Sequence, residues 1–177
     1  MRKLSNNELN RLSVEEFRGK KKIPLVVVLD NIRSMNNIGS VFRTSDAFLV
    51  QKIYLCGITA KPPHADIHKT ALGATESVDW VYVEDTIEAL EQLKEDGYTL
   101  YAVEQAVNSV KLGSIEIDKN EKVVVVLGHE VRGVQQAVVD FCDYALEIPQ
   151  FGTKHSLNIS VCAGITMWEL AKQFHNL

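Results

Sequence analysis

Three short segments of the sequence carry the polar and glycine residues that are able to do chemistry. The first is 37–43 (NIGSVFR), the second is 127–133 (LGHEVRG) and the third is 148–160 (IPQFGTKHSLNIS). Each of them follows or opens an expected strand. Open α/β sheets bind their ligands at the carboxyl ends of their strands. These segments are therefore candidate ligand-binding loops.

The second segment centres on Gly128, which directly follows the apolar run 122–127 (KVVVVL). A glycine at the end of a buried strand lets a ligand approach the backbone closely. An ordinary strand-to-helix turn, with Gly133 relieving helix packing, explains the same residues without a ligand. His129 and Glu130 begin the zinc motif H-E-x-x-H, but position 133 is glycine, which disfavours a zinc protease.

The third segment contains 152–156 (GTKHS), which has a glycine and a lysine in the wrong spacing for a Walker A loop. A Rossmann dinucleotide fingerprint is also missing after the first expected strand. Ser156, Asn158 and Ser160 stand near the start of a helix, where backbone amides bind carboxylates and other anions. The alternative is that these side chains only cap the helix.

In the first segment, Arg43 lies on an expected helix with its stem among apolar neighbours. It is either a solvent-facing arginine or a functional cation near the carboxyl edge of the sheet. Asn37, six residues earlier, caps that helix or faces a substrate. His64 and His68 have the spacing of two metal ligands on one helix face, but no third ligand is evident, so no metal site is predicted.

Strands and helices alternate along the chain, which predicts an α/β fold with a mostly parallel sheet and helices on both faces. The expected strands are 25–30, 52–56, 79–84, 98–103, 122–127 and 144–148. The expected helices begin near Asn36 or Asn37 and then cover 65–71, 86–95, 131–141 and 157–174. Residues 106–120 are expected to be irregular.

The composition describes one ordinary globular domain of 177 residues, with 46% hydrophobic and 24% charged residues. The sequence lacks an apolar stretch long enough for a membrane span and a secretory signal at its start. Its three cysteines, Cys56, Cys142 and Cys162, are far apart in the sequence. This pattern argues against disulfides and favours a reduced, cytoplasmic location.

The net charge of −4 is unusual for a protein that binds nucleic acid. Residues 1–22, however, contain seven Lys/Arg and three acidic residues, so they carry +4 and the remainder carries −8. We predict a basic N-terminal extension over 1–22 and one folded domain over 23–177. The extension is either a phosphate-binding arm or a solvated tail.

The order and spacing of the three segments resemble the motifs of the SpoU (TrmH-like) branch of the SPOUT RNA methyltransferases. The resemblance covers roughly residues 23–175 and includes 69–74 (KTALGA). It implies a single SPOUT-type domain with a deep trefoil knot at its C-terminal end, homodimers and S-adenosylmethionine as cofactor. It also implies methyl transfer to a ribose 2′-hydroxyl of tRNA or rRNA, with no membrane or metal partner.

The resemblance assigns roles to individual residues. Positions that match the family's catalytic residues are Arg43, Asn37, Glu130, Ser156 and Asn158. Positions expected to contact the cofactor are Ala102, Val103, Glu104, Leu127, Gly128, Glu130, Ile148, Pro149, Ser156 and Leu157. Since a guanidinium is essentially always protonated, Arg43 either acts as an unusual base or orients the hydroxyl and stabilises developing negative charge. The apolar part of 157–174, including Trp168, is a candidate dimer surface.

Two other classes of function remain open at this point. One is a knotted RNA-binding or assembly factor that is catalytically idle. The other is an unrelated α/β domain that binds a different nucleotide. The sequence does not distinguish tRNA from rRNA, because base recognition comes from surface contacts that these segments do not encode.

Overall fold

The computed structural model describes residues 1–177, apart from the side chain of Asn6. The strands are β1 Ile23–Asp30, β2 Val50–Cys56, β3 Trp80–Val83, β4 Tyr98–Val103, β5 Val110–Lys111, β6 Lys122–Leu127 and β7 Tyr144–Glu147. The α-helices are α1 Val14–Gly19, α2 Met35–Ala47, α3 Ala65–Ala71, α4 Ala74–Ser77, α5 Thr86–Glu95, α6 Gln136–Phe141 and α7 Ile159–His175. Two short 3₁₀ helices cover Asn6–Leu9 and Leu112–Ser114.

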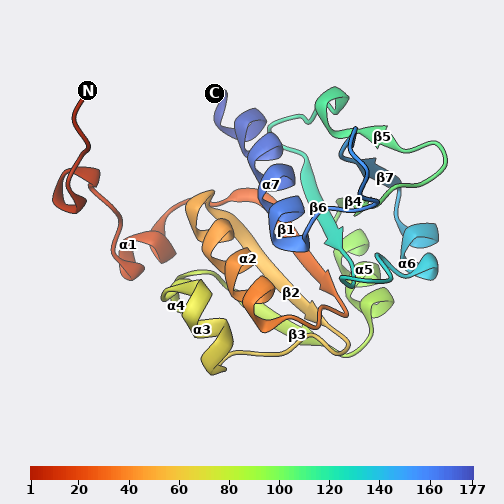
Figure 1. Cartoon of the computed structure of the whole chain (residues 1–177), viewed down its shortest axis with the longest axis horizontal. Helices are drawn as coiled ribbons and strands as arrows, with labels where there is room; N and C mark the ends of the chain where they lie inside the picture. The colour runs from red at the N-terminus through yellow and green to blue at the C-terminus, as the bar shows by residue number, and fades with distance from the viewer.

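The seven strands form one sheet in the order β3-β2-β1-β6-β4-β7-β5, and all neighbouring strands are parallel. Figure 1 shows α2 and α7 on the front face of this sheet and α5 behind it. This confirms the predicted α/β fold with a parallel sheet between two layers of helices. All carboxyl ends of the strands lie at one edge, which is where the three segments are brought together.

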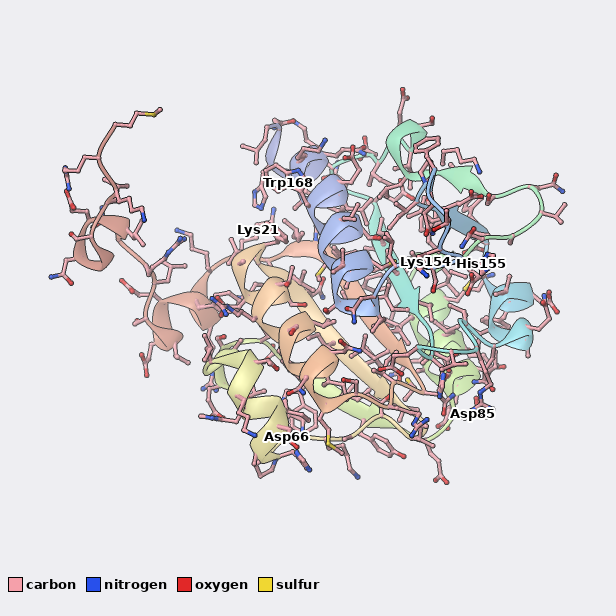
Figure 2. All side chains as sticks on the ribbon, in the orientation of Figure 1. Lys21, Asp66, Asp85, Lys154, His155 and Trp168 are labelled. Atoms are coloured by element: carbon pink, nitrogen blue, oxygen red, sulfur yellow. The ribbon has the colours of Figure 1, made fainter. Side chains whose placement is uncertain are left out.

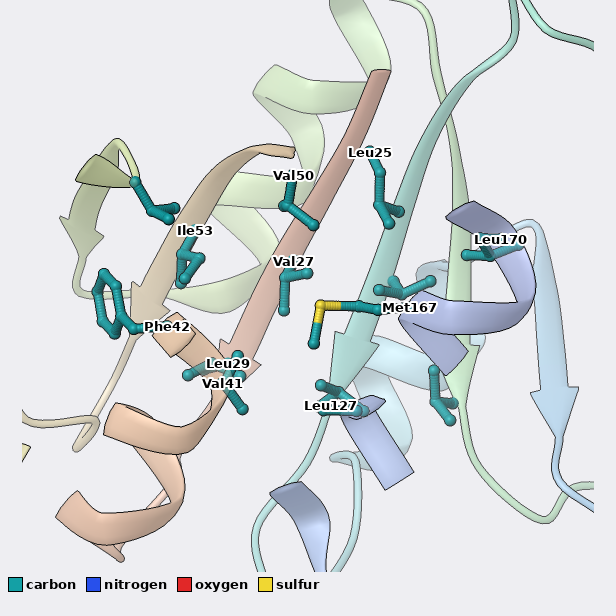
Figure 3. Packing of buried hydrophobic residues seen from close by; sticks show 14 of the residues in the cluster. Leu25, Val27, Leu29, Val41, Phe42, Val50, Ile53, Leu127, Met167 and Leu170 are labelled. Atoms are coloured by element: carbon teal, nitrogen blue, oxygen red, sulfur yellow. The ribbon is translucent and has the colours of Figure 1, made fainter. Parts of the chain in front are cut away.

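The side chains of β1 and β6 alternate between the two faces, and both faces are buried. On one side Leu25, Val27 and Leu29 pack against α2 and α7, as Figure 3 shows for Val41 and Met167. On the other side the core includes β1 residues 26 and 28 and the apolar side of α5. Each fully buried side chain of this size contributes roughly 1.5–3 kcal/mol, so the two central strands fix the sheet.

The N-terminal residues are partly packed against the domain. Phe17 of α1 is 4% exposed and joins the main core. Arg18 donates from Nε to the carbonyl oxygen of Glu76, 3.1 Å away, and Lys22 stacks over the Phe17 ring. Residues 14–19 therefore form a docked helix, whereas Figure 1 shows the residues before α1 extending away from the domain.

Several expected boundaries need correction. Helix α2 begins at Met35, because the Ser34 hydroxyl, not Asn36 or Asn37, caps it by accepting the amide of Asn37. Helix α5 keeps its expected bounds, with Asp85 as its cap. Residues 106–120 are not wholly irregular, since they contain β5 and a 3₁₀ turn.

The helix expected over 131–141 starts only at Gln136. The residues before it form a loop that closes on itself. The amide of His129 donates to the carbonyl oxygen of Gly133 at 3.0 Å, and the amide of Gly133 donates to that of His129 at 2.8 Å. Gly133 has φ +67°, a left-handed conformation that a helix does not contain.

Helix α7 carries a stripe of apolar side chains that is open to solvent in the single chain. Val161, Ile165 and Trp168 are 51%, 39% and 46% exposed, and these residues share one side of the helix. Leu170 lies on the opposite side and is buried in the core. Among the described residues, none of the helices is long and apolar enough to cross a membrane.

Candidate functional site

A cavity of about 830 Å³ lies at the carboxyl ends of β4, β6 and β7. Its walls come from the loops that follow these three strands and from residues of α6 and α7. They include eight of the ten residues expected to contact a cofactor: Val103, Glu104, Leu127, Gly128, Glu130, Ile148, Ser156 and Leu157. A cavity of this size, with apolar walls and a few polar groups, suits a small-molecule ligand.

Two of the expected cofactor residues lie elsewhere. Ala102 is fully buried inside β4, where it pairs with Val126 of β6 and Ala145 of β7. Pro149 is exposed in the loop after β7 and is not part of the cavity wall. Each of them is adjacent in sequence to a lining residue, Val103 or Ile148. The sequence pattern identified the end of each strand but not which of the neighbouring residues faces the cavity.

The loop that follows β6 has little freedom to move. A Cβ added at Gly128 would lie 2.1 Å from the amide nitrogen of Val134, so only glycine allows the loop to fold back here. The His129 side chain is 7% exposed, and its Nδ1 accepts the amide of Val131 at 3.0 Å. The loop therefore presents its backbone to the cavity in a fixed form.

Two carboxylates hold the far end of this loop. Glu104 at the end of β4 accepts the amides of Val134 and Gln105, at 3.1 and 2.8 Å. Asp30 at the end of β1 is fully buried and accepts both the amide and the side-chain N–H of Gln135, at 3.1 and 2.9 Å. The Asp30 carboxylate also accepts the Thr86 hydroxyl at 2.7 Å. Asp30 and Gln135 were not predicted as site residues, and the only signal in the sequence is an acid at the end of a buried strand.

Glu130 connects the same loop to the start of α2. Its carboxylate accepts the backbone amides of Arg33 and Ser34, at 3.1 and 2.9 Å, and the side-chain N–H of Asn37 at 3.0 Å. Burial is the largest influence on the Glu130 carboxyl and acts to raise its pKa. The N–H donors outweigh burial together and hold the pKa below its usual value.

The third segment reaches the same place through Asn158. Its side-chain N–H donates to Oδ1 of Asn37, 3.3 Å away, and its own Oδ1 accepts the amide of Ser160 as the cap of α7. The structure thus brings Asn37, Glu130 and Asn158 into one hydrogen-bonded group. The carboxylate of Glu130 is already hydrogen-bonded to N–H groups at the start of α2. Its role in the structure is therefore to hold the loop in position.

Ser156 and Arg43 complete the predicted set and lie apart from that group. Ser156 is exposed and lines the cavity. Arg43 lies on α2 with an exposed side chain, and it is not one of the lining residues. In a single chain the cavity and the candidate catalytic cation are therefore separate features.

The described residues contain no group of three or more His, Cys, Asp or Glu side chains placed to hold a metal ion. His64 caps α3 by accepting the amide of Asp66 at its Nδ1, and His68 lies in the last turn of the same helix. The three cysteines are free thiols. Burial raises the pKa of the Cys162 thiol, which lines the cavity, to about 11.

Comparison with known proteins agrees with this architecture. A profile of the SpoU rRNA Methylase family matches residues 24–168, which is most of the chain, so the protein belongs to this family. A Staphylococcus aureus protein assigned to the TrmH family of tRNA/rRNA methyltransferases is 28% identical over 164 residues. That alignment includes 93% of this chain and 65% of the relative, so the chain spans less than two thirds of the length of the curated relatives it matches.

Two solved structures are similar over most of the chain. The TrmH/SpoU tRNA modifying enzyme of A. aeolicus superposes with a TM-score of 0.81 at 27% identity, covering 92% of this chain and 83% of that one. The AdoMet-bound rRNA methyltransferase of Sinorhizobium meliloti gives a TM-score of 0.79 at 27% identity, covering 91% and 60%.

Proposed function

We propose that this protein is an S-adenosylmethionine-dependent methyltransferase that methylates a ribose 2′-hydroxyl in tRNA or rRNA. The observation that carries the proposal is that the second and third segments line one cavity at the carboxyl edge of the sheet, while Asn37 of the first segment is hydrogen-bonded to Glu130 and Asn158 of the other two. The similarity to a tRNA modifying enzyme and to an AdoMet-bound rRNA methyltransferase supports it. The trefoil knot implied by the family stays a prediction, as does a cytoplasmic location.

The cofactor would occupy the cavity described above. Backbone groups of the loop after β6 and apolar residues such as Leu127 and Ile148 would surround its adenine, which needs edge hydrogen bonds in a mostly apolar slot. The cofactor supplies an electrophilic methyl group bonded to a positively charged sulfur. The protein contributes by holding that methyl group in line with the attacking oxygen.

In the reaction, the bound cofactor would supply its methyl group to the ribose 2′-oxygen and leave as the thioether. The products are a 2′-O-methylribose, S-adenosylhomocysteine and a proton, which passes to solvent or a nearby phosphate. Arg43 is the candidate for orienting the hydroxyl and stabilising the developing negative charge on oxygen, because it stays protonated. Asn37, Glu130 and Asn158 would keep α2 in register with the cavity loops.

We also propose that the protein forms a homodimer through the exposed stripe of α7. Trp168 lies in the C-terminal half of this helix, as Figure 2 shows, and the centre of its ring is 5.7 Å from that of Phe48, the residue that follows α2. Since Arg43 is not in the cavity wall, either the RNA spans both places or a second copy brings its own Arg43 to the cavity. Trp168→Glu should give monomers by analytical ultracentrifugation, and an unchanged dimer would place the interface elsewhere.

The decisive experiment uses radiolabelled S-adenosylmethionine with unmodified tRNA and rRNA transcripts in separate reactions. We expect label in one RNA pool, resistance of the labelled linkage to alkaline cleavage, and one equivalent of S-adenosylhomocysteine. Arg43→Ala should lose at least 100-fold in transfer rate and keep its cofactor affinity in calorimetry. Lys119→Ala, which removes an exposed cation in the loop before β6, is the control and should be fully active.

Full activity of Arg43→Ala would remove that residue from the mechanism. Cofactor binding without transfer to any RNA would favour the catalytically idle RNA-binding factor. Failure to bind S-adenosylmethionine, with tight binding of another nucleotide, would refute the proposal. Mixing Arg43→Ala with Gly128→Ala subunits tests whether the second copy supplies Arg43 to the cavity. Activity returns in the mixture only if the intact cavity of one copy works with the intact Arg43 of the other.

A further inference from the structure

The segment that joins β7 to α7 forms one wall of the cavity. Four of its residues are in the lining: Gln150, His155, Ser156 and Leu157. Residues 151–158 are all exposed and contain neither helix nor strand. The two ends of the segment are anchored, because Ile148 packs on the main core and Asn158 caps α7. The wall between these anchors is therefore an exposed stretch of irregular chain.

One hydrogen bond holds the middle of this segment in place. Gln105 lies two residues after the end of β4 and also lines the cavity. Its Nε2 donates to the carbonyl oxygen of His155 at 2.6 Å. Among the described residues, this is the only hydrogen bond that links 150–157 to another part of the chain. The wall therefore depends on a single side chain for its position over the cavity.

The loop after β6, on another side of the cavity, is held far more firmly. It is closed by the His129–Gly133 backbone pair, and the Glu104 carboxylate accepts the amide of Val134 just beyond that pair. Glu104 also accepts the amide of Gln105 at 2.8 Å, which fixes the backbone from which the Gln105 side chain reaches. Parts of a structure with few contacts open at the lowest free energy. The wall formed by 150–157 is thus the side at which the cavity opens most easily.

We infer that Gln105 is a positioning residue that latches the segment 150–157 over the cavity, and that this latch sets how long the bound cofactor stays. The inference rests on the proposed function for the identity of that ligand, S-adenosylmethionine. Gln105 and His155 are both exposed, so water competes for the two groups and the bond opens readily. Loss of the latch should favour the open form by about three- to fivefold, the lower part of what one neutral hydrogen bond contributes.

A direct contact between Gln105 and the cofactor is the alternative, since this side chain lines the cavity. The two roles differ in the free protein. A latch restrains the segment whether or not a ligand is present, whereas a ligand contact has no effect until the ligand binds. A measurement on the free protein therefore separates them.

The first test uses trypsin, which cleaves after lysine, on the full chain without cofactor. The bond between Lys154 and His155 adjoins the carbonyl group that the latch holds, and Figure 2 shows these two residues next to each other. Gln105→Met has a similar length but cannot donate, and Gln105→Asn keeps the amide on a side chain that is one methylene shorter. Both variants should be cleaved after Lys154 about three- to fivefold faster, when opening and closing are faster than cleavage.

Two controls accompany this test. Cleavage after Lys119, in the loop before β6, is followed by mass spectrometry in the same samples and should be unchanged. Gln92→Met makes the same substitution at an exposed position of α5 and should leave cleavage at both lysines as in the wild type. Saturating S-adenosylmethionine should protect Lys154 in the wild type.

The second test measures the kinetics of S-adenosylmethionine binding by surface plasmon resonance. Gln105→Met and Gln105→Asn should release the cofactor about three- to fivefold faster, because the segment opens more often. Their association rate should not fall, since an open segment does not obstruct entry. Damage to the shape of the cavity would instead slow association, so the split between the two rates reports the latch and not a general structural role.

Cleavage after Lys154 within about twofold of wild type in both variants would overturn the latch and leave the proposed function intact. Faster release of the cofactor with unchanged cleavage would also overturn it and assign Gln105 to a direct ligand contact. Slower association would assign Gln105 to the shape of the cavity. A wild-type protein that does not bind S-adenosylmethionine would refute the proposed function and the cofactor part of this inference, while the trypsin test still decides whether Gln105 holds the segment.

Discussion

Replacing Glu130 by glutamine tests whether this carboxylate holds the cavity loop on α2. The carboxylate accepts three N–H groups, and one amide oxygen cannot replace both carboxylate oxygens. Glu130→Gln therefore points its own NH₂ at the backbone amide of Arg33 or at that of Ser34. The variant keeps the size of the side chain, so the packing of the loop is unchanged and the effect reports the lost charge and acceptor.

The expected loss follows from two contributions. One hydrogen bond to a charged group is worth about 1.5–3 kcal/mol, reduced here to about 1 because Glu130 is only half-buried and water can replace it. Loss of a negative charge at the amino end of α2 costs about 0.3–1 kcal/mol more. Glu130→Gln should therefore lower the free energy of unfolding by about 1.3–2 kcal/mol at pH 7. With a urea dependence of about 2 kcal/mol per molar, the unfolding midpoint falls by about 0.7–1 M.

The pH dependence gives this prediction its sharper form. The pKa of Glu130 is lower in the folded protein than its usual value, so its stabilising contribution is present above the unfolded pKa of about 4.3. It disappears as the pH falls toward the folded pKa, where protonated glutamate and glutamine become alike. The difference between wild type and Glu130→Gln should be constant from pH 7.5 to about 5.5 and shrink below pH 5.

Urea unfolding at a series of pH values measures that difference directly. Glu91→Gln, at an exposed position on α5, is the control and should change stability by less than about 0.5 kcal/mol at every pH. A loss below about 0.5 kcal/mol for Glu130→Gln at pH 7 would refute the anchoring role. A larger loss that stayed constant down to pH 3.5 would refute its electrostatic origin.

Three further predictions concern the same region. Gly128→Ala should weaken S-adenosylmethionine binding at least tenfold in calorimetry, because its Cβ would lie 2.1 Å from a backbone nitrogen, whereas Gly113→Ala, with nothing within 4 Å, should bind normally. In urea titrations, Asp30→Asn should lower the free energy of unfolding by about 2 kcal/mol and Thr86→Val by about 1 kcal/mol, because the Asp30 carboxylate accepts several hydrogen bonds and Thr86 donates one of them. A larger loss for Thr86→Val than for Asp30→Asn would contradict this. Cys162, with its pKa raised to about 11, should react with iodoacetamide at pH 8 roughly 100-fold more slowly than a free thiol, by peptide mass spectrometry; reaction at the free-thiol rate would show that the thiol is not shielded.

The strands were the most predictable part of the fold. The runs 98–103 and 122–127 have the same bounds in the structure as in the sequence-based expectation, and so does the helix 86–95. These elements are specified locally, because a continuous apolar run or a helical period records burial directly. The order of the strands in the sheet is a long-range property that no local pattern contains.

The loop after β6 shows why the rest was missed. Apolar spacing in 131–141 favours a helix from Val131, but the first three of these residues belong to the loop closed by the His129–Gly133 pair, and the helix starts only at Gln136. The competing interactions come from far away in the sequence: Glu104 binds the amide of Val134, 30 residues on, and Asp30 binds Gln135, 105 residues on. At residues 134 and 135 these tertiary hydrogen bonds override the local preference for a helix. Such conflicts between local preference and fold are expected at functional sites.

The candidate site was predicted as a set of motif positions and not as a geometry. Asn37, Glu130 and Asn158 do meet, but as a hydrogen-bonded brace between α2, the cavity loop and α7. Arg43 stands away from the cavity wall, and nothing in residue spacing indicated that separation. The sequence therefore predicted which polar residues belong to the site. Only the structure shows which of them hold loops together and which are free to contact a ligand.

The acidic net charge, which argued against a nucleic-acid partner, has a structural explanation at this site. The carboxylates of Asp30, Glu104 and Glu130 face inward and accept hydrogen bonds from backbone amides. These acidic groups therefore hold the loop in shape. Arg132, on the loop after β6, is exposed and forms no ion pair among the described residues. If RNA binds here as proposed, its phosphates would approach this exposed cation, since the potential close to a surface depends on the nearest exposed charges more than on the total. Net charge is therefore a poor guide to nucleic-acid binding in a protein whose acids serve as internal hydrogen-bond acceptors.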